Sequence, residues 1–206
     1  MIRELSSKIA KWLEQEGVIS GKDNGLFSYA VYSLLFGLLP IFIVVVLGLA
    51  FRMVREGLLM ITPFMLIRKF SGGYHLASPK LCVLLSSILI AIALLTVKSV
   101  QTAGKTDILS LVVLISVVSL CICSPIDNDT KKLAEKERKA FRKITQVLSM
   151  MLLAFYFVLR VTVPLNYTGS LGVGILLAAS LQYPCIMGRL TIMQKMGKTF
   201  CFSIIL

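Results

Sequence analysis

Six long runs of apolar residues divide this chain of 206 residues. A hydrocarbon core is about 30 Å thick, so a helix that crosses it needs about 20 mostly apolar residues. An open sheet leaves backbone hydrogen bonds unsatisfied in lipid. Hydrophobic residues make up 57% of the sequence, more than a water-soluble domain usually carries. We therefore expect an all-α integral membrane protein with about six transmembrane helices, at residues 26–51, 57–67, 81–97, 108–124, 144–163 and 169–188.

The second run is the shortest, because its uninterrupted apolar core covers only residues 57–67. A membrane span normally needs at least about 17 residues. This run can still cross the bilayer if it begins near Met53 and if Arg55, Arg68 and Lys69 extend toward the two interfaces, at modest cost. The alternative is a re-entrant segment, and the sequence leaves both structures open.

The basic residues favour one orientation of these spans. If six helices start from a cytoplasmic N-terminus, most of the 22 Lys and Arg residues lie inside, and the outside loops carry only Arg52, Arg55, Lys98 and Lys105. This asymmetry follows the positive-inside rule. Together with attraction to an anionic lipid membrane, it accounts for most of the net charge of +12. Nucleic acid binding is therefore not expected.

Residues 1–16 predict an amphipathic helix that lies on the membrane surface. Their apolar side chains recur at helical spacing, at Ile2, Leu5, Ile9, Trp12 and Leu13. The segment lacks the long apolar core and the small-residue cleavage site of a signal peptide, so we treat it as part of the mature protein.

We expect one membrane domain over residues 1–206, with the transmembrane bundle at residues 26–188. The longest polar segment is a basic cytoplasmic loop at residues 125–143. Asp129 or Thr130 could begin a helix there that carries charges of both signs.

The five cysteines do not predict a metal site. They are Cys82, Cys121, Cys123, Cys185 and Cys201, and no two of them form a CxxC pair. Because the inferred compartment is reducing, a disulfide framework is not expected either. We predict neither a metal nor a cofactor.

The chemistry is expected where the only histidine, His75, precedes Cys82 by seven residues. A neutral imidazole can take a thiol proton, and a thiolate can attack a carbonyl. A continuous helix would hold the two about 10.5 Å apart along its axis. However, Ser78-Pro79 is a helix-start signal, and Gly72-Gly73 gives the preceding chain the freedom to fold His75 back. Cys82 then lies in the first turns of the third span, where the helix N-terminus and Lys80 favour a thiolate.

This segment resembles the accessory gene regulator B (AgrB) family of bacterial quorum-sensing membrane peptidases. The resemblance is carried by a basic residue, by Ser71-Gly72-Gly73-Tyr74-His75 and by a cysteine seven positions after the histidine. The chain length, the charged N-terminal helix, the six apolar runs and a second basic loop with Pro125 and Lys131-Lys132 extend it over essentially the whole chain. This chain has Lys131-Lys132-Leu133 where the family often shows Lys-Pro-Leu.

The resemblance implies a cysteine endopeptidase without a cofactor, in the bacterial cell membrane, multi-pass, with its active site on the cytoplasmic side. Its substrate would be a small amphipathic propeptide with an acidic C-terminal tail. Cys82 would be the nucleophile and His75 its base, and a thioester on Cys82 would permit cyclisation to a thiolactone or lactone signalling peptide. The family also implies a homodimer.

Several further residues are candidates for substrate binding. An acidic tail suits the basic surface expected around the site, and backbone N–H groups of a glycine pair can hold an oxyanion. A charge within a membrane span should face the bundle interior or a partner, which adds one arginine of the fifth run. The candidates are Arg68, Lys69, Gly72, Gly73, Lys80, Lys131, Lys132 and Arg160.

Two other functions stay open at this point. A small multi-span transporter or exporter of a peptide would need polar residues that face one another inside the spans. The runs offer little of this kind beyond Arg160 and scattered Ser, Thr and Gln residues. A noncatalytic scaffold would be insensitive to thiol alkylation.

Overall fold

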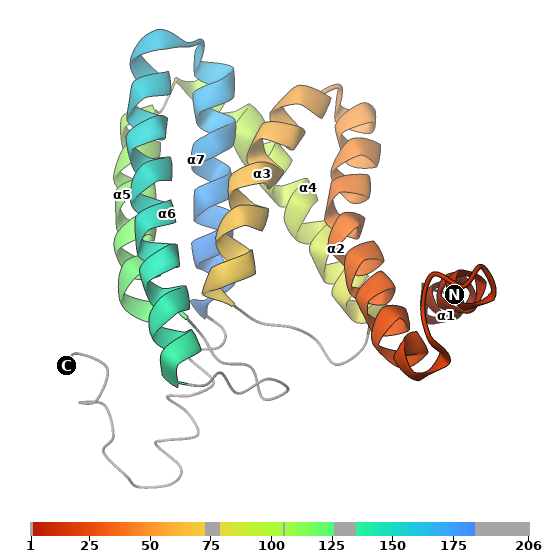
Figure 1. Cartoon of the computed structure of the whole chain (residues 1–206). Coiled ribbons are helices and arrows are strands. Elements are labelled where there is room, and N and C mark those ends of the chain that lie inside the picture. The colour runs from red at the N-terminus through yellow and green to blue at the C-terminus, as the bar shows by residue number, and fades with distance from the viewer. Residues whose placement is uncertain (1, 73–78, 105, 126–134, 184–206) are drawn as a thin grey trace, which may run out of the picture.

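A computed structural model of the chain describes residues 2–72, 79–104, 106–125 and 135–183, and every long element within them is a helix. Figure 1 shows six of these helices packed side by side, with a seventh beside one end of the bundle. The elements are α1 (Ile2–Gln15), the 3-10 turn η1 (Gly21–Asp23), α2 (Asn24–Phe51), α3 (Val54–Ser71), α4 (Pro79–Ala103), α5 (Thr106–Cys123), α6 (Glu135–Thr162) and α7 (Leu165–Ser180).

Each of the six apolar runs contains a helix. Three of the helices, α2, α4 and α6, are long and apolar enough to cross a membrane, judged over the described residues. α5 and α7 are apolar but shorter, and α3 has 18 residues with charges near both ends. The all-helical prediction is therefore confirmed, and the three long helices fit a membrane protein.

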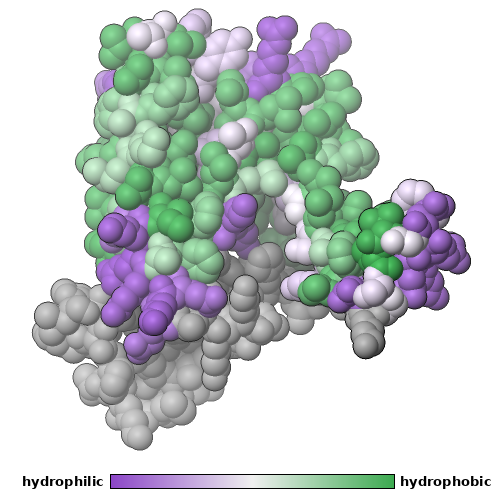
Figure 2. Space-filling view, in the orientation of Figure 1, coloured by the Kyte–Doolittle hydropathy of each residue, from purple (hydrophilic) through white to green (hydrophobic). Residues whose placement is uncertain are grey.

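The outside of the bundle is apolar along most of its length. Figure 2 shows hydrophobic residues over the bundle, with hydrophilic residues gathered at its ends and on α1. Leu34 and Leu38 of α2 and Ile88 and Ile92 of α4 are all exposed. A water-soluble protein rarely shows such a continuous apolar surface, whereas lipid tails cover it without cost.

α7 lies inside the bundle, where it contacts α3, α4 and α5. α7 can come close to α3 because residue 174 is a glycine. A Cβ at this position would collide with the backbone carbonyl of Met60 and would lie 2.7 Å from Cγ of Pro63. A side chain at Gly172 would lie 2.9 Å from the fully buried ring of Tyr156. Small residues at such positions let helix backbones approach closely in a membrane.

A tight turn joins α2 to α3 and makes them antiparallel neighbours. Arg52 closes α2 in the left-handed region, with φ of 57°, and the N–H of Met53 donates to the Gly48 carbonyl at 2.7 Å. A side chain at Gly48 would lie 2.9 Å from Cα of Val54. This turn fixes how the two helices face the remainder of the bundle.

α1 packs against α2 at the end of the bundle where α4 begins. Ser6 and Ala10 are buried, whereas Leu5 and Trp12 are 49% and 57% exposed. The predicted helix at residues 1–16 is thus present as α1, and its place on a membrane surface stays a prediction.

α6 begins at Glu135, within the segment that we expected to be the basic loop of residues 125–143. The predicted helix start at Asp129 or Thr130 lies outside the described residues, and so does the end of the sixth run beyond residue 183. Phe70 of α3 and Phe141 of α6 have ring centroids 6.2 Å apart, so these helix ends lie together.

Candidate functional site

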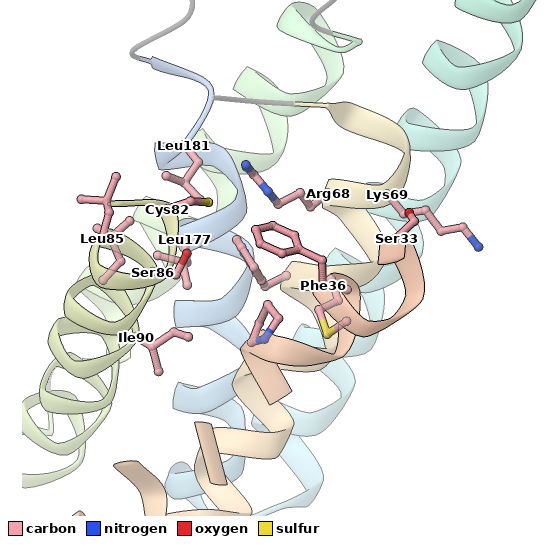
Figure 3. A pocket seen from close by; sticks show the side chains of 15 residues that line it. Ser33, Phe36, Arg68, Lys69, Cys82, Leu85, Ser86, Ile90, Leu177 and Leu181 are labelled. Atoms are coloured by element: carbon pink, nitrogen blue, oxygen red, sulfur yellow. The ribbon is translucent and has the colours of Figure 1, made fainter. Parts of the chain in front are cut away.

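A cavity of about 410 Å³ lies among α2, α3, α4 and α7. Figure 3 shows side chains of all four helices around it. Its walls are mainly apolar, and they include Phe36, Pro40, Phe64, Leu85, Ile90 and Leu177. A mainly apolar cavity with a few polar groups is the usual form of a small-molecule or peptide side-chain site.

Cys82 lines this cavity from the first turns of α4. Pro79 is the first residue of that helix, as the Ser78-Pro79 pattern predicted, so Cys82 is its fourth residue. The thiol is free and half-buried, and in Figure 3 the sulfur faces the cavity. Ser86 follows one helical turn later and lines the same cavity.

Arg68 and Lys69, from the last turn of α3, line the cavity opposite α4. The guanidinium carbon of Arg68 lies 5.8 Å from the centroid of the Phe64 ring. Figure 3 shows Arg68 reaching toward the side of the cavity where Cys82 lies, whereas Lys69 points away. Nζ of Lys69 lies 5.7 Å from the centroid of the Phe70 ring. The structure therefore brings one predicted substrate-binding cation, Arg68, close to the predicted nucleophile.

α3 ends next to Gly72, which has φ of 71°. This left-handed conformation is readily adopted by glycine and is strained for other residues. The preceding Ser71 is only 1% exposed, so α3 is held in place up to this point. His75 and Gly73 lie outside the described residues, and Lys80 is described only by its place in the first turn of α4.

Lys131 and Lys132 also lie outside the described residues. α6 resumes the chain at Glu135, and the contact between Phe70 and Phe141 holds its first turns beside the end of α3. The basic loop is therefore attached at the same end of the bundle as Cys82.

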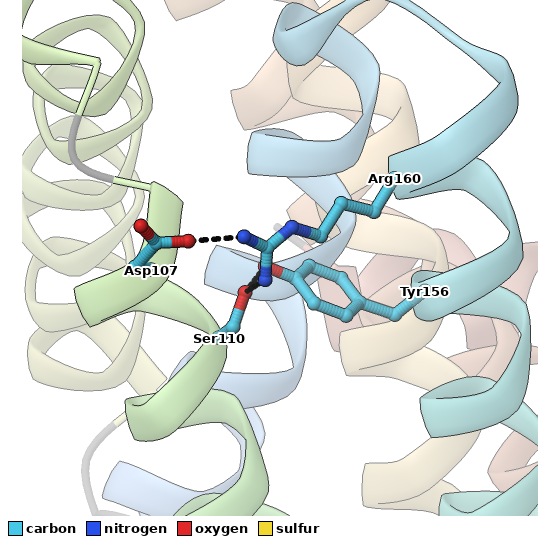
Figure 4. Close-up of polar contacts among 4 residues, drawn as sticks. All are labelled: Asp107, Ser110, Tyr156 and Arg160. Carbon is cyan, nitrogen blue, oxygen red and sulfur yellow. Dashed lines mark hydrogen bonds and ion pairs between the residues drawn. The ribbon is translucent and has the colours of Figure 1, made fainter.

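Arg160 is not brought to this cavity. Its guanidinium forms an ion pair with Asp107 and donates a hydrogen bond to Oγ of Ser110, and the hydroxyls of Ser110 and Tyr156 are 3.0 Å apart (Figure 4). Asp107 lies in the first turn of α5, just after the far end of α4 from Cys82. The charge of this arginine is thus matched within the protein, about 30 Å along α4 from the sulfur.

Sequence reasoning did not select Ser33, Gly37 and Pro40 of α2 or Leu181, which directly follows α7, and these residues line the cavity as well. Ser86 was open to prediction, because residues four apart share one face of a helix. The residues of α2 and Leu181 carry no such signal, since a membrane helix has apolar side chains both on its lipid-facing side and on its inward side.

Comparison with known proteins identifies relatives over most of this chain. Residues 6–185 match the accessory gene regulator B (AgrB) family. A protein named AgrB-like protein 2, from Clostridium perfringens strain 13, is 28% identical over 178 residues, which cover 82% of this chain and 80% of that protein. An AgrB-like protein from Clostridium perfringens strain SM101 is 30% identical over 149 residues, with 69% and 70% covered. No solved structure matches this chain significantly.

Proposed function

Because this chain belongs to the AgrB family, we propose that it is a membrane cysteine endopeptidase that removes the C-terminal tail of a small signalling propeptide. Membership of this family points to the processing of propeptides in quorum sensing. The nucleophile that we propose is Cys82, and the base is His75.

The observation that carries the proposal is the position of the Cys82 sulfur. It faces a mainly apolar cavity from the start of a long helix, with Arg68 on the opposite wall. The helix N-terminus and the guanidinium both favour the negative charge of the oxyanion that forms during attack. Apolar walls reduce the water that would compete for an acyl intermediate.

The sequence limits how far His75 can lie from the start of α4. It precedes Pro79, the first residue of α4, by four positions, a length of chain that spans at most about 14 Å when fully extended. Gly72, with its positive φ, turns the chain out of α3 at the other end. The segment of His75 therefore connects two helix ends, α3 and α4, that both border the cavity.

The reaction follows from these groups. His75 takes the thiol proton, and the Cys82 thiolate attacks the carbonyl at the junction between the signal and the tail. The C–N bond breaks, His75 passes the proton to the departing amine, and the acyl group stays on Cys82 as a thioester. A thiol or hydroxyl of the bound peptide then attacks this thioester, closes the ring and returns the Cys82 thiol.

The acidic tail of such a substrate would meet the positive charge at the end of α3. Arg68 and Lys69 are the described cations that line the cavity. We include Lys80, Lys131 and Lys132 in the same proposed surface on the strength of their places in the sequence. Opposite charge on tail and protein would speed association more than it would tighten binding.

We further propose that α2 to α7 all cross the bacterial cell membrane and that the Cys82 end is cytoplasmic. α3, α5 and α7 are shorter than α2, α4 and α6, but they pack against these longer helices and against one another. Most of the chain's basic residues then lie inside, as the positive-inside rule requires.

The test is cleavage in cells that produce this chain together with a tagged candidate propeptide, which has an amphipathic leader, a central Cys or Ser and an acidic tail. Cys82→Ser and His75→Ala should each reduce cleavage at least about 100-fold, because nucleophile and base act together. Cys121→Ser is the matched control, since Cys121 is also a half-buried free thiol but lies on α5, away from the cavity. Wild-type cleavage by Cys82→Ser would refute the proposal.

A further inference from the structure

We propose that the part of the cavity beyond Cys82 is a specificity pocket for an apolar side chain of the propeptide. This side chain belongs to the residue whose carbonyl is attacked, so it remains on the acyl side of the cleaved bond. The inference rests on the proposed function and names the substrate feature that this function would select.

The cavity extends along α4 for two helical turns past the sulfur. Cys82, Ser86 and Ile90 line it at spacings of four residues, which places its far end about 12 Å along the helix from Cys82. The walls of the cavity also include Phe36, Phe64 and Leu177. Moving an apolar side chain from water into such walls is favourable in proportion to the area buried.

Charge distinguishes the two sides of the cleaved bond. Arg68 lies near the sulfur, where an acidic leaving tail would be attracted, and it is absent from the far end of the cavity. The acyl part must stay bound until the ring closes, whereas the tail must leave. An apolar pocket that binds only the side chain on the acyl side would keep this part of the peptide in place, because that contact remains after the tail departs.

A backbone group in the wall favours a peptide over a lipid chain as the occupant. Pro40 has no N–H, so the Phe36 carbonyl, one turn earlier in α2, cannot receive the usual helical hydrogen bond from residue 40. Both residues line the cavity. A backbone carbonyl left without a donor in apolar surroundings is costly, and the N–H of a bound peptide can supply that donor, whereas a lipid acyl chain cannot.

Gly37 allows the pocket to be filled without disturbing the helix around it. It lines the cavity, and a Cβ added there would meet no atom within 4 Å. Gly25 is the matched control, because a Cβ there also meets no atom within 4 Å, and this residue lies on α2 but not in the cavity. Gly25→Leu therefore reports what a larger side chain on α2 does when it lies outside the cavity.

The experiment measures alkylation of Cys82 by two reagents that differ only in one side chain, acetyl-leucyl and acetyl-alanyl chloromethyl ketone. The purified full chain in detergent carries Ser in place of the other four cysteines, and intact mass reports the rate. We expect the leucyl reagent to react about 10-fold faster than the alanyl reagent. Gly37→Ala should reduce this preference and Gly37→Leu should abolish it, while Gly25→Leu should keep it.

Equal reaction of the two reagents with the unsubstituted pocket, or an undiminished preference in Gly37→Leu, would overturn the inference. So would a preference that disappears when phosphatidylglycerol is added, because a lipid chain would then be the occupant. The reagent preference compares two rates at one sulfur and does not require a working base. It therefore persists if only the peptidase assignment fails, and cleavage by the unaltered protein persists if only the pocket assignment fails.

Discussion

Arg160 is the residue at which the structure gives a physical account that the sequence did not. Its side chain is 30% exposed, and its guanidinium is bound by Asp107 and Ser110, whose side chains come from the neighbouring helix α5. A charge in an apolar helix has to find a partner, and this one finds it at the end of the bundle away from Cys82. Its role in substrate binding stays a prediction, and it would concern a different part of the molecule from the cavity.

Ser110→Ala should destabilise the protein more than Asp107→Asn. The Ser110 hydroxyl is buried and joins the Arg160 guanidinium to the Tyr156 hydroxyl, so its loss leaves two polar groups without this partner and costs about 1–2 kcal/mol. The Asp107 side chain is 91% exposed, and water replaces most of what it contributes. Thermal unfolding in detergent measures both variants.

An equal loss of stability in the two variants would contradict this ranking. Cleavage of the propeptide by Ser110→Ala should match the wild type, because the network does not touch the cavity. A stable Arg160→Gln variant that loses cleavage would instead assign this arginine to the substrate.

At the scale of helices, the close approach of α7 to α3 can be tested by a single substitution. Gly174→Ala places a methyl group against the Met60 carbonyl and Pro63, both on α3, and neither backbone nor proline ring can turn aside. We expect a loss of about 2–3 kcal/mol or failure to insert, as for other overpacked cores. The measurement is thermal unfolding of the detergent-solubilised protein together with its yield in membranes.

Gly169→Ala on the same helix is the control for this substitution. Its Cβ would lie 3.8 Å from Cγ1 of Val100, an ordinary contact, and the change to alanine should favour the helix slightly. If both variants were equally stable, the close approach of α7 to α3 would be wrong.

The existence of the helices was predictable from the sequence, and their packing was not. The apolar run at residues 108–124 matches α5 (Thr106–Cys123) to within two residues at each end. This agreement is expected, because a chain in lipid must pair its own backbone groups as a helix, and the length of an apolar run can be read from the sequence. In lipid, however, outward and inward faces are both apolar. Leu34 and Leu38 of α2 are exposed while Val44 of the same helix is fully buried, and nothing in their chemistry separates them.

The same reasoning explains what was predictable of the candidate site. The start of α4 at Pro79 and the place of Cys82 in its first turns follow from local sequence signals. The α2 wall with Phe36 and Pro40 depends on how distant segments pack, and no local signal reports it. The apolar run at residues 144–163 does not reach the start of α6 at Glu135, but the charged first turns of α6 belong to the mixed-charge helix that the sequence predicted from Asp129 or Thr130.

At the scale of the whole molecule, the distribution of charge differs between the two ends of the bundle, and we propose that these ends face different compartments. The Cys82 end carries Arg68 and Lys69 on α3 and the basic first turns of α6. The described part of the far end carries Arg52, Arg55, Lys98 and Arg160 beside the acidic Glu56 and Asp107. The membrane potential and the translocation machinery both favour the more basic end inside.

Thiol labelling of intact cells tests this orientation and also tests whether the short helix α5 crosses the bilayer. Thr102→Cys places a thiol on an exposed position at the far end of α4, and Lys139→Cys places one on an exposed position near the start of α6. The two positions are separated by α5 alone. In a chain without its native cysteines, a membrane-impermeant maleimide should label only the Thr102→Cys variant from outside, and the Lys139→Cys variant only after the cells are opened. Labelling of both from the same side would mean that α5 does not span, and labelling of Lys139→Cys alone in intact cells would place Cys82 outside the cell.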